Sequence, residues 1–389
     1  MKFNKYYLLF LIGCLSSYYW ISPVTQIPGV DFELNFFNRV IRTIYPLFIG
    51  LFIFNKVLKT TVNRFLLLFI FSFLIIPIFI TLIFNLNLGV IVYLPVLVSF
   101  LGLIFLATLK PSEFYFWYFG TSFVSSIFLS VGLLKFGFDA TTFYGRPRVH
   151  FGFIHPVQSS SIIISSFSFF ILILHHSINS LKYINLFYFI TYLCFSVLLF
   201  LAQSSNLFIA FNISVLTFLL FKIFNSITIK SLLLIVLLFV PFSFFFFINL
   251  PVNLMEFLDD FSSGRILNYK ELFFTNLNGE DFFSFLFGPT KFLRHLIDIN
   301  DVTGFASRDS VFFSFFLAFG FFGLSSLVLF FFLIGILLIK YNLSSFSVFC
   351  GVLFFFSADA QGLTPNNLLI YACLAFVLNQ YSNSYKFNE

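Results

Sequence analysis

Two short arginine motifs stand outside the long apolar runs of this chain, each beside a predicted helix end. The first, at residues 145–148, reads GRPR and precedes an apolar run, whereas the second, at residues 262–265, reads SSGR and opens a predicted helix. A guanidinium group binds two oxygens at once, and the free N–H groups of a helix start add positive potential. The sequence therefore predicts a site for an anionic group, and a diphosphate suits it well. The residues concerned are Arg146, Arg148, Gly264 and Arg265.

Both motifs belong to polar segments, at 135–156 and 251–308. The second segment holds five of the 21 Lys and Arg residues and eight of the 15 Asp and Glu residues. Lys291, Arg294 and Arg308 in this segment are predicted to support anion binding. The alternative is that these cations form ordinary ion pairs with acidic residues of the same loops.

No metal or cofactor site is predicted. His150 and His155 flank the FGFI stretch of the first segment and are able to bind a metal, but no pair of carboxylates lies near them in sequence. The four Cys residues lie within apolar runs without CxxC spacing. Nucleotide-binding and hydrolase motifs such as GxGxxG and GxSxG are lacking.

The composition is that of an integral membrane protein. Hydrophobic residues make up 60% of the 389 residues, charged residues 9%, and the mean hydropathy is +1.03. Because soluble domains are about a quarter charged, the fold class predicted is an all-α polytopic membrane protein. The net charge of +6 is dispersed between apolar runs, so that it does not indicate nucleic-acid binding. The N-terminus resembles a signal peptide without a small-residue cleavage site, and a retained first span is expected.

Apolar runs long enough to cross the hydrocarbon core of a membrane predict about twelve transmembrane helices. They lie at 6–22, 41–55, 64–85, 89–109, 113–135, 157–177, 183–201, 205–224, 230–250, 309–339, 343–358 and 364–381. The chain thus divides into residues 1–250 with nine helices, the large polar loop at 251–308, and residues 309–389 with three helices. Within the loop, short helices are predicted near 264–276 and 291–299, lying on the membrane face over the spans.

Basic residues between the apolar runs predict the orientation. One set of connections is rich in Lys and includes Lys5, Lys110 and Lys340, whereas the short connections of the opposite set have no Lys or Arg. The positive-inside rule then places both termini in the cytoplasm and both polar segments outside. The arginines of the polar segments run against this rule, so another role must favour them there.

Three segments together resemble the bacterial O-antigen polymerase and O-antigen ligase superfamily. RPRVHFGFIHPVQSSSI at 146–162 resembles the family's segment with Arg, Gly-Phe and His/Asn-Pro, and QSSN at 203–206 resembles its small polar segment. SSGRILNYKELF at 262–273, followed by LFGPTKF and RDSVFFSFFLAFGFFGL, resembles its Ser-Gly-Arg block. The ligase branch has a His where this chain reads Ser307-Arg308-Asp309-Ser310, which favours a polymerase. Asn206 stands where many relatives have Arg.

The resemblance implies a metal-independent glycosyltransferase without a cofactor in the bacterial inner membrane. Its donor and acceptor would be oligosaccharide repeat units on undecaprenyl diphosphate, joined at the periplasmic face. The implied partners are these lipid-linked sugars, membrane lipids and a chain-length regulator protein. Arg148 and Arg265 are expected to stabilise the diphosphate leaving group.

An acceptor hydroxyl needs a base, and His155, Asp309 and Asp139 are the candidates in that order. The alternatives are a loop or cap contact for His155 and a helix N-cap for Asp309. Other functions stay open: an O-antigen ligase, another lipid-linked-sugar transferase, or a flippase. A flippase is expected to carry charges inside its spans and to lack a large roofing loop.

Overall fold

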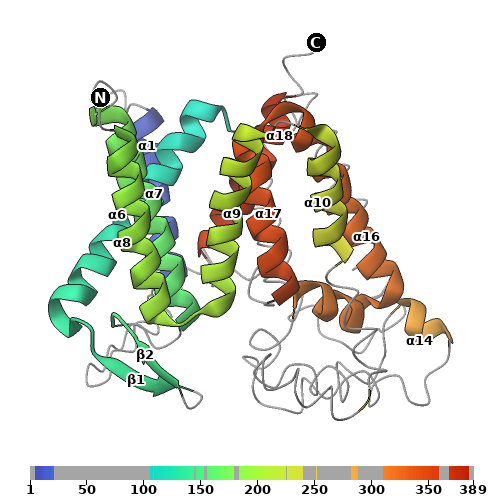
Figure 1. Ribbon diagram of the computed structural model, residues 1–389, viewed down its shortest axis with the longest axis horizontal. Coiled ribbons are helices and arrows are strands. Elements are labelled where there is room, and N and C mark those ends of the chain that lie inside the picture. The colour runs from blue at the N-terminus through green and yellow to red at the C-terminus, as the bar shows by residue number, and fades with distance from the viewer. Residues whose placement is uncertain are drawn as a thin grey trace. The chain divides into compact units, whose positions relative to one another are not determined.

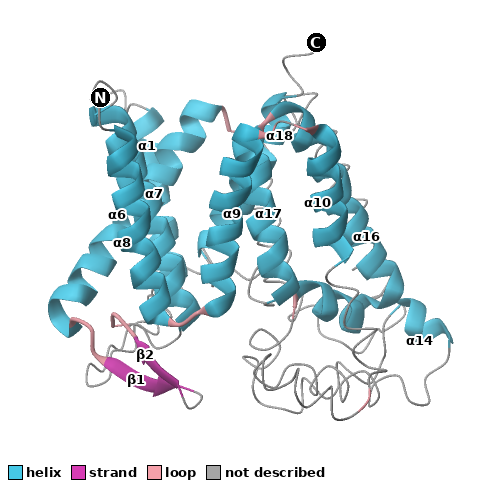
Figure 2. Ribbon diagram, viewed as in Figure 1, coloured by secondary structure: helices cyan, strands magenta, loops and turns pink. Residues whose placement is uncertain are grey.

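The computed structural model describes residues 5–21, 106–107, 109–143, 146–152, 156–178, 184–224, 226–239, 251, 282–287, 310–358 and 368–384. These residues are mostly helical, with one two-stranded antiparallel sheet, as Figures 1 and 2 show. The predicted spans at 41–55 and 64–85 lie outside the described residues.

The described elements fall into two compact units. The first unit contains α1 (Lys5–Ile21), α6 (Pro111–Phe136), β1 (Ala140–Phe143), β2 (Arg146–Val149), α7 (Pro156–Ile178), α8 (Ile184–Ala202), the first part of α9 (Ser205–Ile223) and α18 (Leu368–Ser384). The second contains the rest of α9, α10 (Ile227–Phe239), α14 (Phe282–Phe287), α16 (Val311–Tyr341) and α17 (Leu343–Ala358).

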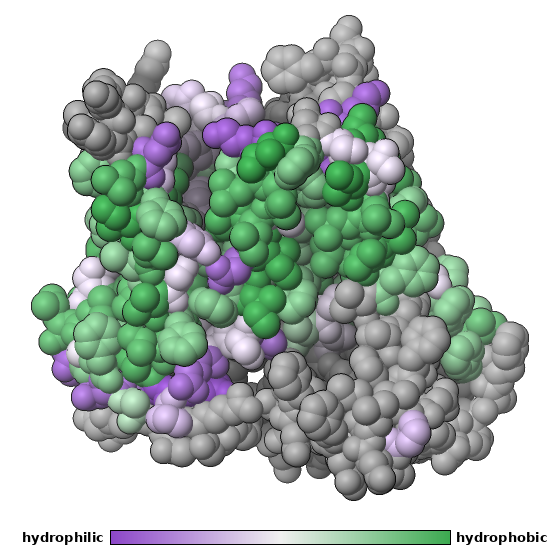
Figure 3. Space-filling view, viewed as in Figure 1, coloured by the Kyte–Doolittle hydropathy of each residue, from purple (hydrophilic) through white to green (hydrophobic). Residues whose placement is uncertain are grey.

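The helices have the length and surface of membrane spans. Four are long and apolar enough to cross a bilayer: Pro111–Phe136, Asn185–Ala202, Ser205–Ile223 and Phe319–Lys340. Their charged residues stand only in the first or last turn. Large apolar side chains are exposed along α8, α9 and α10, and Figure 3 shows the apolar surface over the helices. Because such a surface is unfavourable in water, the chain is a membrane protein.

Glycine residues bring α1 and α6 into close contact. A Cβ atom on Gly13 would lie 2.1 Å from the Trp117 carbonyl oxygen, and one on Gly120 would lie 2.3 Å from that of Phe10. In a bilayer, where the hydrophobic effect does not join helices, such close backbone contact is a main source of helix association. The two helices run parallel, with the ion pair between Lys5 and Glu113 at their first turns. This direction is the one that the predicted first and fifth spans require.

Buried polar side chains bond to backbone groups where α6 begins. Glu113 accepts a hydrogen bond from the backbone N–H of Lys110 at 3.1 Å, as in a capping box. Asn379 of α18 is fully buried and donates to the carbonyl oxygens of Leu106 and Leu109 at 2.9 and 2.8 Å. Asn379 thus satisfies two carbonyl groups at the entry to α6, where unpaired backbone groups are costly in a membrane.

The helices α6, α7 and α8 pack in sequence, and single side chains of α8 and α9 touch. Small side chains lie between α6 and α7, and their hydroxyl groups bond to their own helices, as Ser125 does to the Thr121 carbonyl at 3.0 Å. An aromatic contact joins α7 to α8: the Phe167 ring meets the Phe195 ring edge-on, with centroids 5.6 Å apart. The Tyr192 hydroxyl donates to the Asn212 side chain, which links α8 to α9.

In the second unit, α16 is broken at Gly320, whose φ of 66° lies in the left-handed region. Figure 1 shows the first part of α16 crossing the foot of the upright second part. The upright part packs against α10 and α17, where a Cβ atom on Gly335 would lie 2.6 Å from the methyl carbons of Leu234. The prediction of one continuous span at 309–339 is therefore wrong at its start. The many Phe residues around Gly320 give no sign of the break in the sequence.

Candidate functional site

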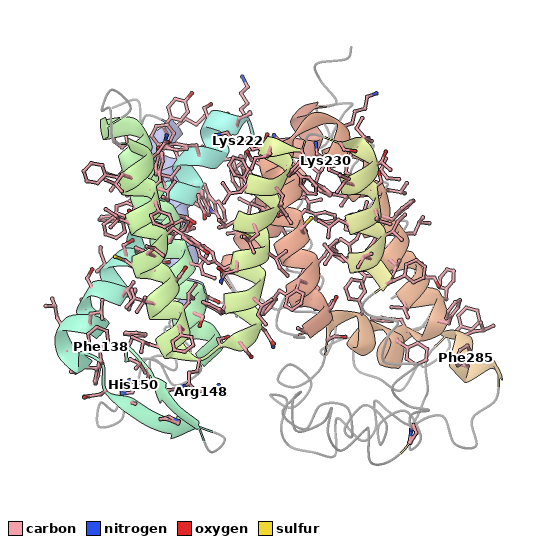
Figure 4. All side chains as sticks on the ribbon, viewed as in Figure 1. Phe138, Arg148, His150, Lys222, Lys230 and Phe285 are labelled. Atoms are coloured by element: carbon pink, nitrogen blue, oxygen red, sulfur yellow. The ribbon has the colours of Figure 1, made fainter. Side chains whose placement is uncertain are left out.

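The first arginine motif lies in a β-hairpin at the end of α6. β1 and β2 are antiparallel, with Thr141 opposite Arg148 and Phe143 opposite Arg146. Residues 144–145 join the two strands and lie outside the described residues. A further bond, from the His150 N–H to the Asp139 carbonyl at 3.4 Å, extends the ladder by one pair beyond β1 and β2. The hairpin thus brings Arg148, His150 and Asp139 together near the C-terminal end of α6. Figure 4 labels the first two of these residues.

Side chains alternate along β2, as in any strand. Val149 and Phe151 are buried, with exposed fractions of 7% and 0%. Arg148 and His150 occupy the intervening positions and are partly exposed. β2 ends at Val149, but the hydrogen bond from His150 to Asp139 continues the ladder, so that Arg148 and His150 lie on the same face while Val149 packs into the unit. β2 also lies against α8.

His150 is held on three sides. Its Nδ1 atom accepts a hydrogen bond from the Gly152 backbone N–H at 2.9 Å. Its carbonyl oxygen accepts one from the Ser159 hydroxyl of α7 at 3.0 Å. Its ring meets the Phe136 ring edge-on, with centroids 5.3 Å apart. Such fixing lowers the entropy that a side chain loses when it binds a ligand.

The turn after β2 depends on two unusual backbone conformations and one glycine of α6. Phe151 has a φ of 46° and Gly152 a φ of 83°, both left-handed. Gly132 lies beneath this turn, where a Cβ atom would be 2.2 Å from the Phe151 carbonyl oxygen. A non-glycine residue with positive φ is uncommon and costs energy, so the contact with α6 must hold Phe151 in place.

Of the second polar segment, the structure describes Pro251 and the short helix α14. The Phe285 ring contacts Phe316 and Phe321, one on each side of the break at Gly320, with centroids 5.8 and 6.0 Å apart. The Phe287 ring contacts Phe322 at 6.0 Å. The helix α14 is thereby attached to the part of α16 around Gly320. Ser310, which directly precedes α16, is buried. Figure 4 shows Phe285 at the end of this unit opposite Lys222 and Lys230.

Most of the other predicted site residues lie outside the described part of the chain. These are His155, Gly264, Arg265, Lys291, Arg294, Arg308 and Asp309. The backbone of Arg146 is described, opposite Phe143 in the hairpin. Of the three base candidates, Asp139 alone is described, and its side chain is exposed beside the hairpin.

The hairpin and α14 are not predicted from the sequence. The prediction of an all-α fold is wrong here. Polar and apolar residues alternate in Arg-Pro-Arg-Val-His-Phe at 146–151 with the period of a strand, which indicates the hairpin. From the sequence alone, His150 is a candidate only for metal binding. Its role in the turn depends on Gly152 and Ser159, and no local pattern shows that contact.

Among the described residues, no three His, Cys, Asp or Glu side chains gather as a metal site requires. The hairpin itself carries Arg148 and His150, both partly exposed. No protein-family model, curated protein or solved structure matches the chain.

Proposed function

We propose that this protein is a glycosyltransferase that polymerises oligosaccharide repeat units carried on undecaprenyl diphosphate. The reaction transfers the growing glycan from its lipid carrier to a hydroxyl group of the next lipid-linked unit. The bond from the sugar to the diphosphate breaks, a glycosidic bond forms, and undecaprenyl diphosphate leaves. The proton of the acceptor hydroxyl passes to a base, for which His155, Asp309 and Asp139 are the candidates.

The observation that carries this proposal is the position of Arg148 and His150 on a fixed hairpin at the end of a membrane helix. Negative charge develops on the diphosphate as it leaves, and fixed donors aimed at that charge stabilise the transition state. A diphosphate attached to a membrane lipid lies at the bilayer surface. A hairpin that directly follows α6 is suited to meet it there.

The charges along α6 support an outward position for the hairpin. Lys5, Lys110 and Glu113 gather at the start of α6, and the hairpin follows its end. The 26 residues between them span about 39 Å, enough to cross the hydrocarbon core. We place the Lys-rich end in the cytoplasm and the hairpin in the periplasm of a bacterial inner membrane. About twelve spans then leave both termini cytoplasmic.

Arg146 of the hairpin is proposed to support Arg148 in binding the diphosphate. The resemblance adds Gly264 and Arg265, with Lys291, Arg294 and Arg308, as further candidates for binding a diphosphate, and these residues lie outside the described part of the chain. The attachment of α14 to α16 supports a loop that lies over the membrane face. No nucleotide or metal is required, because guanidinium groups supply the positive charge.

Deleting the gene in the bacterium that uses this protein to make its surface glycan tests this function. We expect a surface glycan that ends after one repeat unit, because transfer to the surface continues while chain growth stops. The measurement is a gel ladder of the surface glycan from the wild type and the deletion strain. A flippase deletion would remove the glycan entirely, and a ligase deletion would leave long glycan on the lipid carrier. Either of these results would assign the chain to another function.

A further inference from the structure

The hydrogen bond between Gly152 and His150 fixes which imidazole nitrogen carries a hydrogen. Because the Gly152 N–H donates to Nδ1, that nitrogen must present its lone pair. A hydrogen on Nδ1 would face the hydrogen of Gly152. The neutral ring therefore carries its hydrogen on Nε2.

The Nε2 atom remains available for a ligand. Among the described residues, Nε2 has no hydrogen-bond partner, whereas Nδ1, the backbone N–H and the carbonyl of His150 are all used. The side chain is partly exposed. His150 thus presents a donor and not a base, since its other ring nitrogen is occupied.

The position of this donor relates it to Arg148. Residues two apart in a strand project from the same face, with Cα atoms about 7 Å apart. That separation suits two donors that bind different oxygens of one diphosphate. The turn at Phe151 and Gly152, held by Gly132, keeps the imidazole from rotating away.

We propose that His150 binds the leaving diphosphate by donating a hydrogen bond from Nε2, beside Arg148. This inference rests on the proposed function and adds a binding residue to its site. It differs from a metal-binding or general-base role for the same histidine, because both roles need a nitrogen lone pair that faces the ligand.

Two substitutions of similar size distinguish these roles. His150→Gln places an amide N–H near the position of Nε2 but leaves Gly152 without its acceptor. His150→Asn places a carbonyl oxygen near Nδ1 for Gly152 but has no donor near Nε2. We expect the Gln variant to bind diphosphate within about threefold of the wild type. The Asn variant should bind roughly tenfold or more weakly, the usual effect of losing a hydrogen bond to a charged group.

The measurement is binding of undecaprenyl diphosphate to the full-length protein in lipid nanodiscs, with undecaprenol as the control that lacks the diphosphate. Thermal unfolding of each variant shows whether it is folded, and we expect the Asn variant to be the more stable of the two. Strong binding by Asn with weak binding by Gln would show that His150 only supports the turn. Equal losses in both variants would show that a donor at the position of Nε2 does not account for binding. Either result overturns the inference.

The same experiment separates this inference from the proposed function. If the wild type does not prefer undecaprenyl diphosphate to undecaprenol, the diphosphate site itself is wrong and both proposals fall. If the wild type has that preference and Arg148→Ala removes it, the site stands, and the two His150 variants decide the inference alone.

Discussion

Replacing Arg148 with alanine is expected to reduce chain growth by about 100-fold or more, the usual effect of removing one fixed donor from a developing negative charge. The hairpin holds Arg148 beside His150, so the guanidinium group acts from a fixed position. The measurement is the rate at which lipid-linked repeats are lengthened by purified protein. In cells, the surface glycan of the variant should end after one repeat.

Two further variants give this experiment its controls. Arg148→Lys keeps the charge but loses the planar fork, and we expect an intermediate rate. Lys222→Ala removes an exposed cation from the last turn of α9, and we expect the wild-type rate. If Arg148→Ala lengthens chains as fast as Lys222→Ala, the hairpin is not the diphosphate site.

Replacing Gly132 with alanine should destabilise the protein and also disable the site. The new methyl group would lie 2.2 Å from the Phe151 carbonyl oxygen, so that either α6 or the turn must move. Alanine normally favours a helix by about 1 kcal/mol over glycine, but overpacking costs about 1–3 kcal/mol or more. Because the turn positions His150, we expect weaker binding of undecaprenyl diphosphate as well as a lower unfolding temperature.

Gly120→Ala is the matched control. It introduces the same methyl group in the same helix, 2.3 Å from the Phe10 carbonyl oxygen, where α1 packs and the hairpin does not. We expect a similar loss of stability with diphosphate binding retained. If both variants bind equally well, Gly132 does not hold the turn for binding.

The long helices could be predicted from the sequence because one local property determines them. A run of apolar residues about 20 long is stable across a bilayer only as a helix, whatever its neighbours. The predicted spans at 113–135, 183–201 and 205–224 accordingly match α6, α8 and α9 to within two residues at either end. Fine structure inside such runs has no comparable signal, and the break at Gly320 was missed for that reason.

The candidate site was predictable only in part, because its geometry depends on contacts between distant residues. The charge and planar shape of Arg148 single it out in any sequence. In contrast, the role of Gly132 depends on the approach of Phe151, 19 positions further along the chain. The hydrogen bond from Ser159 to the His150 carbonyl likewise requires that α7 returns beside the hairpin.

We propose that this chain joins lipid-linked repeat units, and reconstitution of the purified protein tests this function most directly. The purified protein would be placed in liposomes with a single repeat unit on undecaprenyl diphosphate and no sugar nucleotide, metal ion or other protein. We expect a ladder of longer glycans on the lipid carrier together with released undecaprenyl diphosphate. Movement of the lipid-linked unit across the bilayer without any lengthening would contradict the claim and identify a flippase.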